Sequence, residues 1–205
     1  MKKVFFKPWI GKEYKSGGIF GKKILVVGES HYCGGCDGCG IKFAEQCDDV
    51  QTSDIVKTYL RTHSGEWART FRKFERALVG HETDNIESER IWNSIAFYNY
   101  IQVAMTATRI APGDEEYDAA EEPFFEVLNR LRPDLMIVWG VTRMWDNMPS
   151  RNWEKSDEIE VEGRKVKNGQ YMLDDDHCVR SIWINHPSSG FSWNLWNKVI
   201  QKVLY

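Results

Sequence analysis

The chain has no hydrophobic run that approaches the roughly 20 residues of a membrane-spanning helix, and its lysine-rich start lacks the apolar core of a signal peptide. We therefore expect a cytoplasmic protein that does not enter a membrane. It also has no internal repeat, low-complexity tract or long linker, which excludes a repeat protein. With 205 residues, it is expected to form a single domain over residues 1–205 and to act as a monomer.

An excess of positive charge is also missing, because 27 Lys and Arg face 30 Asp and Glu, for a net charge of −3. This argues against a protein coated in phosphate-binding charge. Residues 1–23, the basic leader, nevertheless carry seven Lys and one Glu, which leaves −9 for the rest of the chain. Because the leader runs into a predicted strand at Ile24–Gly28, we expect its charge near the polar ends of the strands. A second basic stretch, interpreted by itself as a solvated surface, consists of Lys57, Arg61, Arg69, Arg72, Lys73 and Arg76.

Four apolar stretches predict buried β-strands, and helical patterns separate them. The stretches are Ile24–Gly28, Ala96–Gln102, Asp134–Gly140 and the one that begins at Ser181. This order predicts an α/β fold, a three-layer sandwich with a central four-stranded and mostly parallel sheet. Alternating residues around Glu-Gly and Asn-Gly predict a β-hairpin insertion at about residues 156–175.

Polar side chains follow three of these strands. Because the carboxyl ends of parallel strands meet at one edge of a sheet, and ligands bind there in open α/β folds, we expect these side chains to form the functional site. We refer to this edge as the rim. The candidates are Glu29, Ser30, His31 and Tyr32 after the first strand, Asn99 after the second, and His186, Ser188, Ser189 and Phe191 after the last.

Four of the five cysteines lie in one glycine-rich insertion at about residues 31–50: Cys33, Cys36, Cys39 and Cys47. Their spacing predicts a metal site, with one Zn²⁺ as the first choice and a 4Fe-4S cluster as the alternative. Four thiolates would leave no open coordination position, so the site is expected to be structural. It would hold the loop that follows Tyr32.

The ordered motifs resemble those of the uracil-DNA glycosylase superfamily, whose fold is a four-stranded parallel sheet between helices. Gly28–Tyr32 (GESHY) stands where that superfamily has Gly-Gln-Asp-Pro-Tyr-His or Gly-Glu-Ala-Pro-Gly. Val138–Gly140 (VWG) resembles its Leu-Trp-Gly, and His186–Phe191 (HPSSGF) resembles its His-Pro-Ser-Pro-Leu-Ser. Asn99 matches the Asn that contacts the uracil edge. The resemblance spans residues 24–204.

The resemblance implies an enzyme of DNA repair that hydrolyses the N-glycosidic bond of a modified or damaged base in DNA, which can be single-stranded. In this interpretation His186 donates to the carbonyl oxygen of the departing base, Asn99 pairs with the base edge, and Glu29 orients water or stabilises charge on the sugar. The substrate-binding set contains Tyr32 as a pocket wall, Ser188 as a phosphate contact and Phe191 as a wedge, together with Ser30, His31 and Ser189.

Two other functions remain open. The water-activating Asp of one branch of the superfamily is Ser30 in this chain, and the following Pro is His31. A non-catalytic module that binds a nucleic acid or nucleotide is therefore an alternative. A serine esterase of the SGNH type is a lower alternative, with Ser30 as nucleophile and His186 as base. Trp183 occupies the position, three residues before His186, where such an enzyme has an acid.

Overall fold

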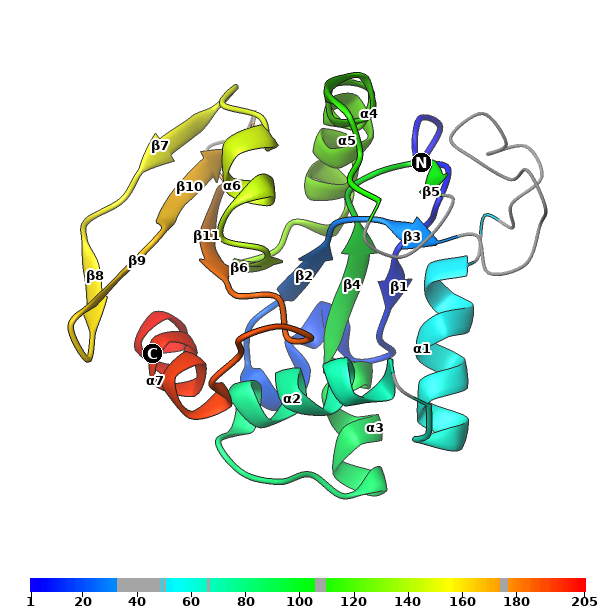
Figure 1. Cartoon of the computed structure of the whole chain (residues 1–205), viewed down its shortest axis with the longest axis vertical. Coiled ribbons are helices and arrows are strands. Elements are labelled where there is room, and N and C mark those ends of the chain that lie inside the picture. The colour runs from blue at the N-terminus through cyan, green and yellow to red at the C-terminus, as the bar shows by residue number, and fades with distance from the viewer. Residues whose placement is uncertain (33–48, 50, 66, 106–109, 174–176) are drawn as a thin grey trace.

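A seven-stranded sheet forms the centre of the molecule and separates two layers of helices (Figure 1). The computed structural model describes residues 1–32, 49, 51–65, 67–105, 110–173 and 177–205. The strand order is β1-β4-β2-β6-β11-β10-β7. The strands are β1 (Trp9–Ile10), β2 (Ile24–Gly28), β4 (Ile95–Asn99), β6 (Leu135–Trp139), β7 (Trp153–Lys155), β10 (Asn168–Met172) and β11 (Cys178–Ile184).

The sheet is mixed, and it is larger than the four strands expected from the sequence. Neighbouring strands β4, β2, β6 and β11 pair in parallel, whereas β1, β10 and β7 are antiparallel to their neighbours. The α/β class is thus confirmed, but the size of the sheet is corrected. Strands β1 and β7 have two and three residues, too short to produce a recognisable apolar run.

Alternating side chains of the parallel strands enter two separate cores. Ile24 and Val26 of β2 belong to one buried cluster, and Leu25 and Val27 belong to the other. This alternation follows from the two-residue period of a strand. Because both faces are covered, the two innermost strands, β2 and β6, are buried and apolar along their whole length, as parallel strands usually are.

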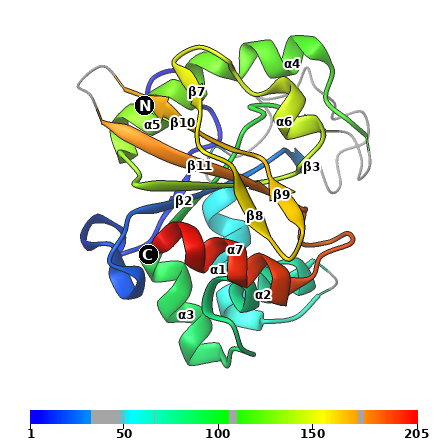
Figure 2. The ribbon, with the colours of Figure 1, turned by 90° about the vertical axis from the view of Figure 1, so that its left-hand side faces the viewer.

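Helices cover the two faces unequally (Figures 1 and 2). Four long helices pack on the first core. The other core is covered by one long helix and two short ones. The first face has α1 (Gln51–Thr62), α2 (Ala68–Val79), α3 (Asn85–Ser94) and α7 (Trp193–Leu204), and the second has α4 (Asp114–Ala119), α5 (Glu121–Leu131) and α6 (Arg143–Asn147). No helix in the described part of the chain is long and apolar enough to cross a membrane.

Two small sheets complete the fold. Strand β3 (His31–Tyr32) pairs in parallel with β5 (Ala104–Met105). Strands β8 (Ile159–Val161) and β9 (Arg164–Val166) form an antiparallel hairpin within the range where the sequence predicts one. The rest of that range differs from the prediction, because β10 joins the main sheet through five residue pairs with β11.

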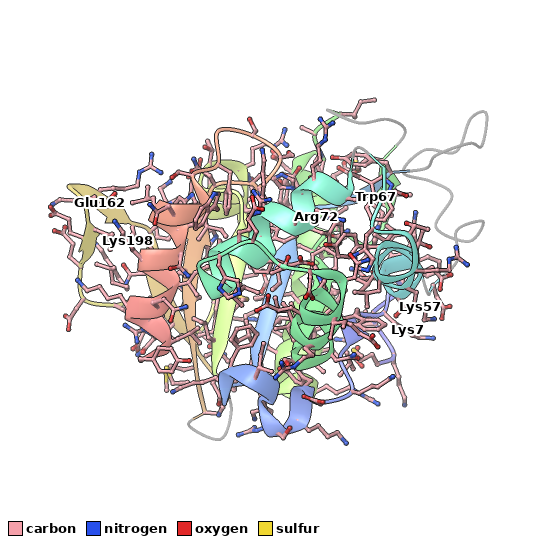
Figure 3. All side chains as sticks on the ribbon, turned by 90° about the horizontal axis from the view of Figure 1, so that it is seen from below. Lys7, Lys57, Trp67, Arg72, Glu162 and Lys198 are labelled. Atoms are coloured by element: carbon pink, nitrogen blue, oxygen red, sulfur yellow. The ribbon has the colours of Figure 1, made fainter. Side chains whose placement is uncertain are left out.

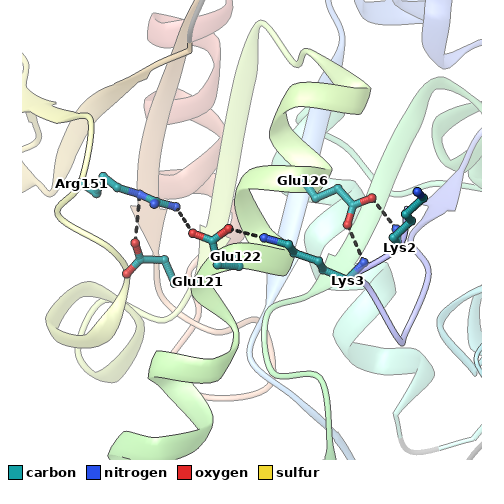
Figure 4. A network of polar contacts seen from close by, with 6 residues as sticks. All are labelled: Lys2, Lys3, Glu121, Glu122, Glu126 and Arg151. Carbon is teal, nitrogen blue, oxygen red and sulfur yellow. Dashed lines mark hydrogen bonds and ion pairs between the residues drawn. The ribbon is translucent and has the colours of Figure 1, made fainter.

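The start of the chain is fixed to α5 by charged groups (Figure 4). The backbone N–H of Lys3 donates to Glu126 Oε2 over 2.7 Å, and Lys3 Nζ contacts Glu122 Oε2 over 2.7 Å. Arg151 Nη2 lies 2.8 Å from the other oxygen of Glu122. The charge of Lys3 is therefore neutralised within the molecule, since it is part of an alternating chain of cations and carboxylates.

Candidate functional site

The parallel strands bring their polar ends to one edge of the sheet. Gly28 of β2 is paired with Asn99 of β4, and Trp139 of β6 is paired with Ile184 of β11. His186 follows Ile184 by two residues, and its ring contacts that of Trp139 edge to face, with 5.6 Å between centroids. Asn99, Trp139 and His186 thus lie on the rim, on the face that α2 and α7 cover.

Gly28 is needed so that Asn99 can lie across the end of β2. A Cβ atom at position 28 would stand 2.3 Å from Asn99 Oδ1, closer than any real contact. The Asn99 Nδ2 atom lies 3.2 Å from both ring nitrogens of His31, and no described residue donates to Oδ1. The structure therefore uses the amide nitrogen of Asn99 inside the protein and leaves its oxygen available as an acceptor.

His31 is a buried, neutral partner of Asn99. Its ring is 2% exposed and contacts Phe6 edge to face, and Nε2 lies 2.8 Å from Thr52 Oγ1. Burial lowers the pKa of His31 to about 3, because the imidazolium would lose its hydration. The sequence predicted that His31 contacts the substrate. We infer instead that His31 supports Asn99.

Glu29 points to the opposite face of the sheet and is held by a cation. Arg143 donates to it through Nε and Nη2 over 3.0 and 2.8 Å, and the Tyr117 hydroxyl donates to Oε1 over 2.7 Å. Burial, and then the bond to the Glu29 carboxylate, raises the pKa of the Tyr117 hydroxyl. Both carboxylate oxygens of Glu29 already accept hydrogen bonds, so the side chain is better placed to fix Arg143 than to activate water.

Arg143 is a rim residue that the sequence analysis missed. Its side chain is 51% exposed, while that of Glu29 is 14% exposed. The signal was present, since Arg143 follows the third parallel strand by four residues, at the edge where the other polar side chains gather. An arginine held by a two-point carboxylate contact at a rim can still present its outer N–H groups to an anion.

His186 has one occupied and one available nitrogen. Nδ1 accepts from the backbone N–H of Ser188 over 3.2 Å and from the Ser188 hydroxyl over 2.7 Å. The proton of the neutral ring therefore resides on Nε2, which has no partner among the described residues. Burial lowers the pKa of His186; the carboxylate of Glu29 raises it, and Arg143 lowers it further. The ring is thus a neutral N–H donor at pH 7, within electrostatic range of Glu29 and Arg143.

The loop after β11 presents serines but not the phenylalanine. Ser188 and Ser189 are exposed, and the backbone N–H of Ser189 donates to the His186 carbonyl over 2.9 Å. Phe191 is only partly exposed, because its ring stacks on Trp196 of α7, with 6.4 Å between centroids. In this arrangement Phe191 closes the end of the core and does not project as a wedge.

Ser30 and Tyr32 complete the described part of the first motif. The hydroxyl oxygen of Ser30 is buried and has no hydrogen-bond partner within the described ranges. No bond joins it to His186, so a serine nucleophile activated by this histidine is not formed. Tyr32 is 42% exposed at the start of the Cys-rich insertion and remains available as a wall of the site.

The predicted metal ligands Cys33, Cys36, Cys39 and Cys47 lie outside the described residues. Within the described ranges no group of three or more His, Cys, Asp or Glu side chains is arranged to hold a metal ion. His31 is the histidine nearest to the insertion, and its ring nitrogens contact Thr52 and Asn99.

Several lysines of the basic leader have no ion-pair partner among the described residues. They lie at the edge of the sheet opposite the rim. Lys12, Lys15 and Lys22 are exposed around the 3-10 turns η1 (Tyr14–Ser16) and η2 (Gly18–Phe20), on the side opposite the loop after β11 (Figures 2 and 3). The reason is directional: a chain enters a strand at its amino end, and the five residues of β2 then span about 17 Å. This corrects the expectation that the charge of the leader lies near the rim.

No family model matches the chain, and the search of curated proteins finds no match either. The functional argument therefore depends on the geometry of the rim.

Proposed function

We propose that the rim binds a modified or damaged base in DNA and that the protein is a glycosylase-like hydrolase that cleaves the bond between this base and its sugar. The observation that carries the proposal is the state of His186, a neutral ring whose Nδ1 accepts from two donors and whose Nε2–H has no acceptor among the described residues. The resemblance of the strand-end motifs to the uracil-DNA glycosylase superfamily supports the same assignment.

The chemistry needs a donor at the place where negative charge develops. When the N-glycosidic bond breaks, its electron pair leaves with the base, and a carbonyl oxygen of the base becomes more negative. A neutral N–H at His186 Nε2 stabilises that oxygen without losing its proton. Water then adds to the sugar carbon and loses one proton. The departing base anion takes up one proton, so the products are the neutral base and an abasic sugar.

Asn99 and Arg143 are the residues we assign to recognition. Asn99 Oδ1, buried and without a donor in the described structure, accepts from an N–H on the edge of the base. Arg143, which Glu29 orients, contacts a phosphate next to the flipped nucleotide. Base and phosphate are thus contacted by different elements of the same rim.

The direct test is to incubate the protein with oligonucleotides that carry a panel of modified bases and to cleave abasic sites with alkali. We expect release of at least one base, and a loss of about 100-fold or more in His186→Gln, the size found for removing one such donor. His81→Gln is the matched control, since His81 is exposed and pairs with Glu87. Equal activity of His186→Gln and wild type would contradict the assignment.

A second candidate, binding without hydrolysis, is favoured by one observation. The carboxylate expected to orient water, Glu29, is engaged by Tyr117 and Arg143. If Glu29 only positions Arg143, Glu29→Gln and Arg143→Gln should weaken binding equally, and the double variant should be no worse than either. If Glu29 acts on water instead, Glu29→Gln should abolish base release while binding persists.

A further inference from the structure

Helix α2 presents a row of cations to solvent. Its buried side contains Phe71, Phe74 and Leu78. Its other side has four basic residues at spacings of three and four, which places them on one face over about 10 Å of helix. This α2 stripe consists of Arg69, Arg72, Lys73 and Arg76.

Two cations of the stripe have no polar partner in the described part of the chain. Arg76 forms an ion pair with Glu82 over 2.8 Å, and Arg72 donates to the carbonyl of His63 over 2.9 Å. Arg69 and Lys73 have no ion-pair or hydrogen-bond partner among the residues that the structure describes. Glu75, the acidic residue of the helix, is fully buried on the inner side and does not offset this surface charge by direct pairing.

An exposed tryptophan stands at the amino end of α2, beside the helix side that is buried. Trp67 directly precedes α2 and is 40% exposed. Its ring is anchored edge to face on Phe71, with 5.5 Å between centroids, and on Tyr59 at 6.3 Å. Gly65 lies beside the indole: a Cβ there would be 3.1 Å from Trp67 Nε1, and its φ of +98° favours glycine. Figure 3 shows Trp67 and Arg72 close together, while Lys57 and Lys7 lie beside α1.

Helix α2, which carries the stripe on its outer side, packs against the rim with its inner side. Phe71 and Phe74, on the inner side of α2, contact the ring of Trp139, with 6.1 and 5.0 Å between centroids. Trp139 in turn contacts His186. One indole therefore separates the inner side of α2 from the proposed reaction site, whereas the unpaired lysines of the leader lie at the other edge of the sheet.

We infer that the α2 stripe and Trp67 form a docking surface for single-stranded DNA, with phosphates along the cations and an unpaired base stacked on the indole. A single strand is favoured because stacking on Trp67 needs a base face that a duplex covers with its neighbouring pairs. The inference rests on the proposed function in taking DNA as the ligand of the rim, and it names the surface that holds the strand outside the site.

The test compares two pairs of charge removals by fluorescence anisotropy on a labelled 12-nucleotide oligothymidine. Arg69→Gln with Lys73→Gln should weaken binding at least tenfold and reduce the slope of log affinity against log salt by about 1.4, since each phosphate contact to a single strand contributes about 0.7. Lys12→Gln with Lys15→Gln removes the same charge at the opposite edge and should leave both values nearly unchanged. Equal effects of the two pairs, or no effect of the first, would overturn the inference.

The role of Trp67 is tested by comparing an aromatic with a non-aromatic replacement. Trp67→Ala should weaken binding about tenfold, and Trp67→Phe should retain most of the affinity, because stacking needs an aromatic face. Thermal unfolding of each variant shows whether the anchoring on Phe71 and Tyr59 is kept. A loss in Trp67→Phe as large as in Trp67→Ala would argue against stacking.

Two further ligands and one variant separate the possible failures. Tighter binding to the duplex, or to the same sequence as RNA, would refute single-stranded DNA as the occupant. Lys165→Gln should bind the oligonucleotide like wild type, because Lys165 pairs with Glu158 on the β8–β9 hairpin, outside both the rim and the stripe. Normal, stripe-dependent binding by a wild-type protein that releases no base would defeat the hydrolase proposal alone.

Discussion

The tautomer and the charge state of His186 are set by its contacts with Ser188 and Trp139. Both donors on Nδ1 come from Ser188, two residues later, so the loop itself selects the tautomer with the proton on Nε2. The packing of the ring on Trp139 then withdraws it from water, which disfavours the imidazolium. Tautomer and charge state are thus set by different neighbours.

This arrangement predicts a dependence of stability on pH. Burial lowers the pKa of His186 in the folded state below the ordinary value of 6.5. As the pH falls below about 6.5, the unfolded chain binds a proton that the folded protein does not, so the free energy of unfolding decreases, by at most about 1.4 kcal/mol per pH unit from this group. The contribution is fully present above pH 6.5. Urea unfolding between pH 7.5 and 5 should therefore show a shallower decline for His186→Gln than for wild type.

His81→Gln provides the control for the same series, and ¹⁵N NMR of the imidazoles reports the tautomer directly. A His186 ring that titrates above pH 6.5, or that carries its proton on Nδ1 at pH 7, would contradict both the stability argument and the proposed donor.

Helix α2 carries a buried, hydrogen-bonded carboxylate on its inner side, opposite the stripe. Glu75 is fully buried and its Oε1 accepts from Tyr59, Ser88 and Trp92 over 2.6 to 2.8 Å, which ties α1, α2 and α3 together. Oε2 accepts from Thr83 over 2.7 Å. Four donors replace the water that the carboxylate loses, so the group contributes to the position of the helix that carries the stripe.

Removing these acceptors should be costly. Glu75→Leu leaves three buried donors without a partner, and we expect the free energy of unfolding to fall by about 3 to 5 kcal/mol. Glu75→Gln should cost only about 1 kcal/mol, because it keeps one oxygen and the Thr83 hydroxyl can accept from the new amide. Chemical unfolding followed by circular dichroism measures both. Exposed Glu82→Leu is the control, and a cost for Glu75→Leu no larger than for this control would show that the network is not stabilising.

Considered as a whole, the molecule combines a rim at one edge of the sheet with a cysteine-rich insertion that begins directly after Tyr32. The ligands Cys33, Cys36, Cys39 and Cys47 remain a prediction. Zinc bound there would compensate the entropy of ordering a glycine-rich loop, which costs roughly 1 to 2 kcal/mol per residue.

Elemental analysis should find about one zinc per chain, without visible absorption, and Cys36→Ser should reduce it. Chelation should raise hydrogen exchange at residues 29–32 while most of the sheet stays protected. A brown protein that contains iron and sulfide would favour the cluster instead. Metal-free protein with an unchanged exchange pattern at these residues would refute both metals.

The sequence was sufficient for the α/β class and for the first parallel strand, which ends at Gly28 as expected, because buried parallel strands are continuous apolar runs that stop where polar residues begin. The second and third parallel strands end at Asn99 and Trp139, before the ends of the expected stretches at Gln102 and Gly140. The sequence could not show the three antiparallel strands that complete the sheet, β1, β10 and β7, because they form no long apolar run and depend on pairing with their neighbours. Strand β10, with its Asn and Gly, was interpreted as part of an insertion for the same reason.

The tertiary structure alone decided what the polar residues do. Asn99 is the last residue of β4, level with Gly28, and Glu29 is one position beyond the end of β2. Because neighbouring positions along a strand point to opposite faces, Glu29 contacts Arg143 and Asn99 contacts His31. Likewise, two basic stretches of similar charge lie in different places, because the leader enters β2 at its amino end whereas α1 and α2 cover a face of the sheet. Such partners come from distant parts of the chain, and only folding brings them within the few ångströms over which hydrogen bonds and ion pairs act.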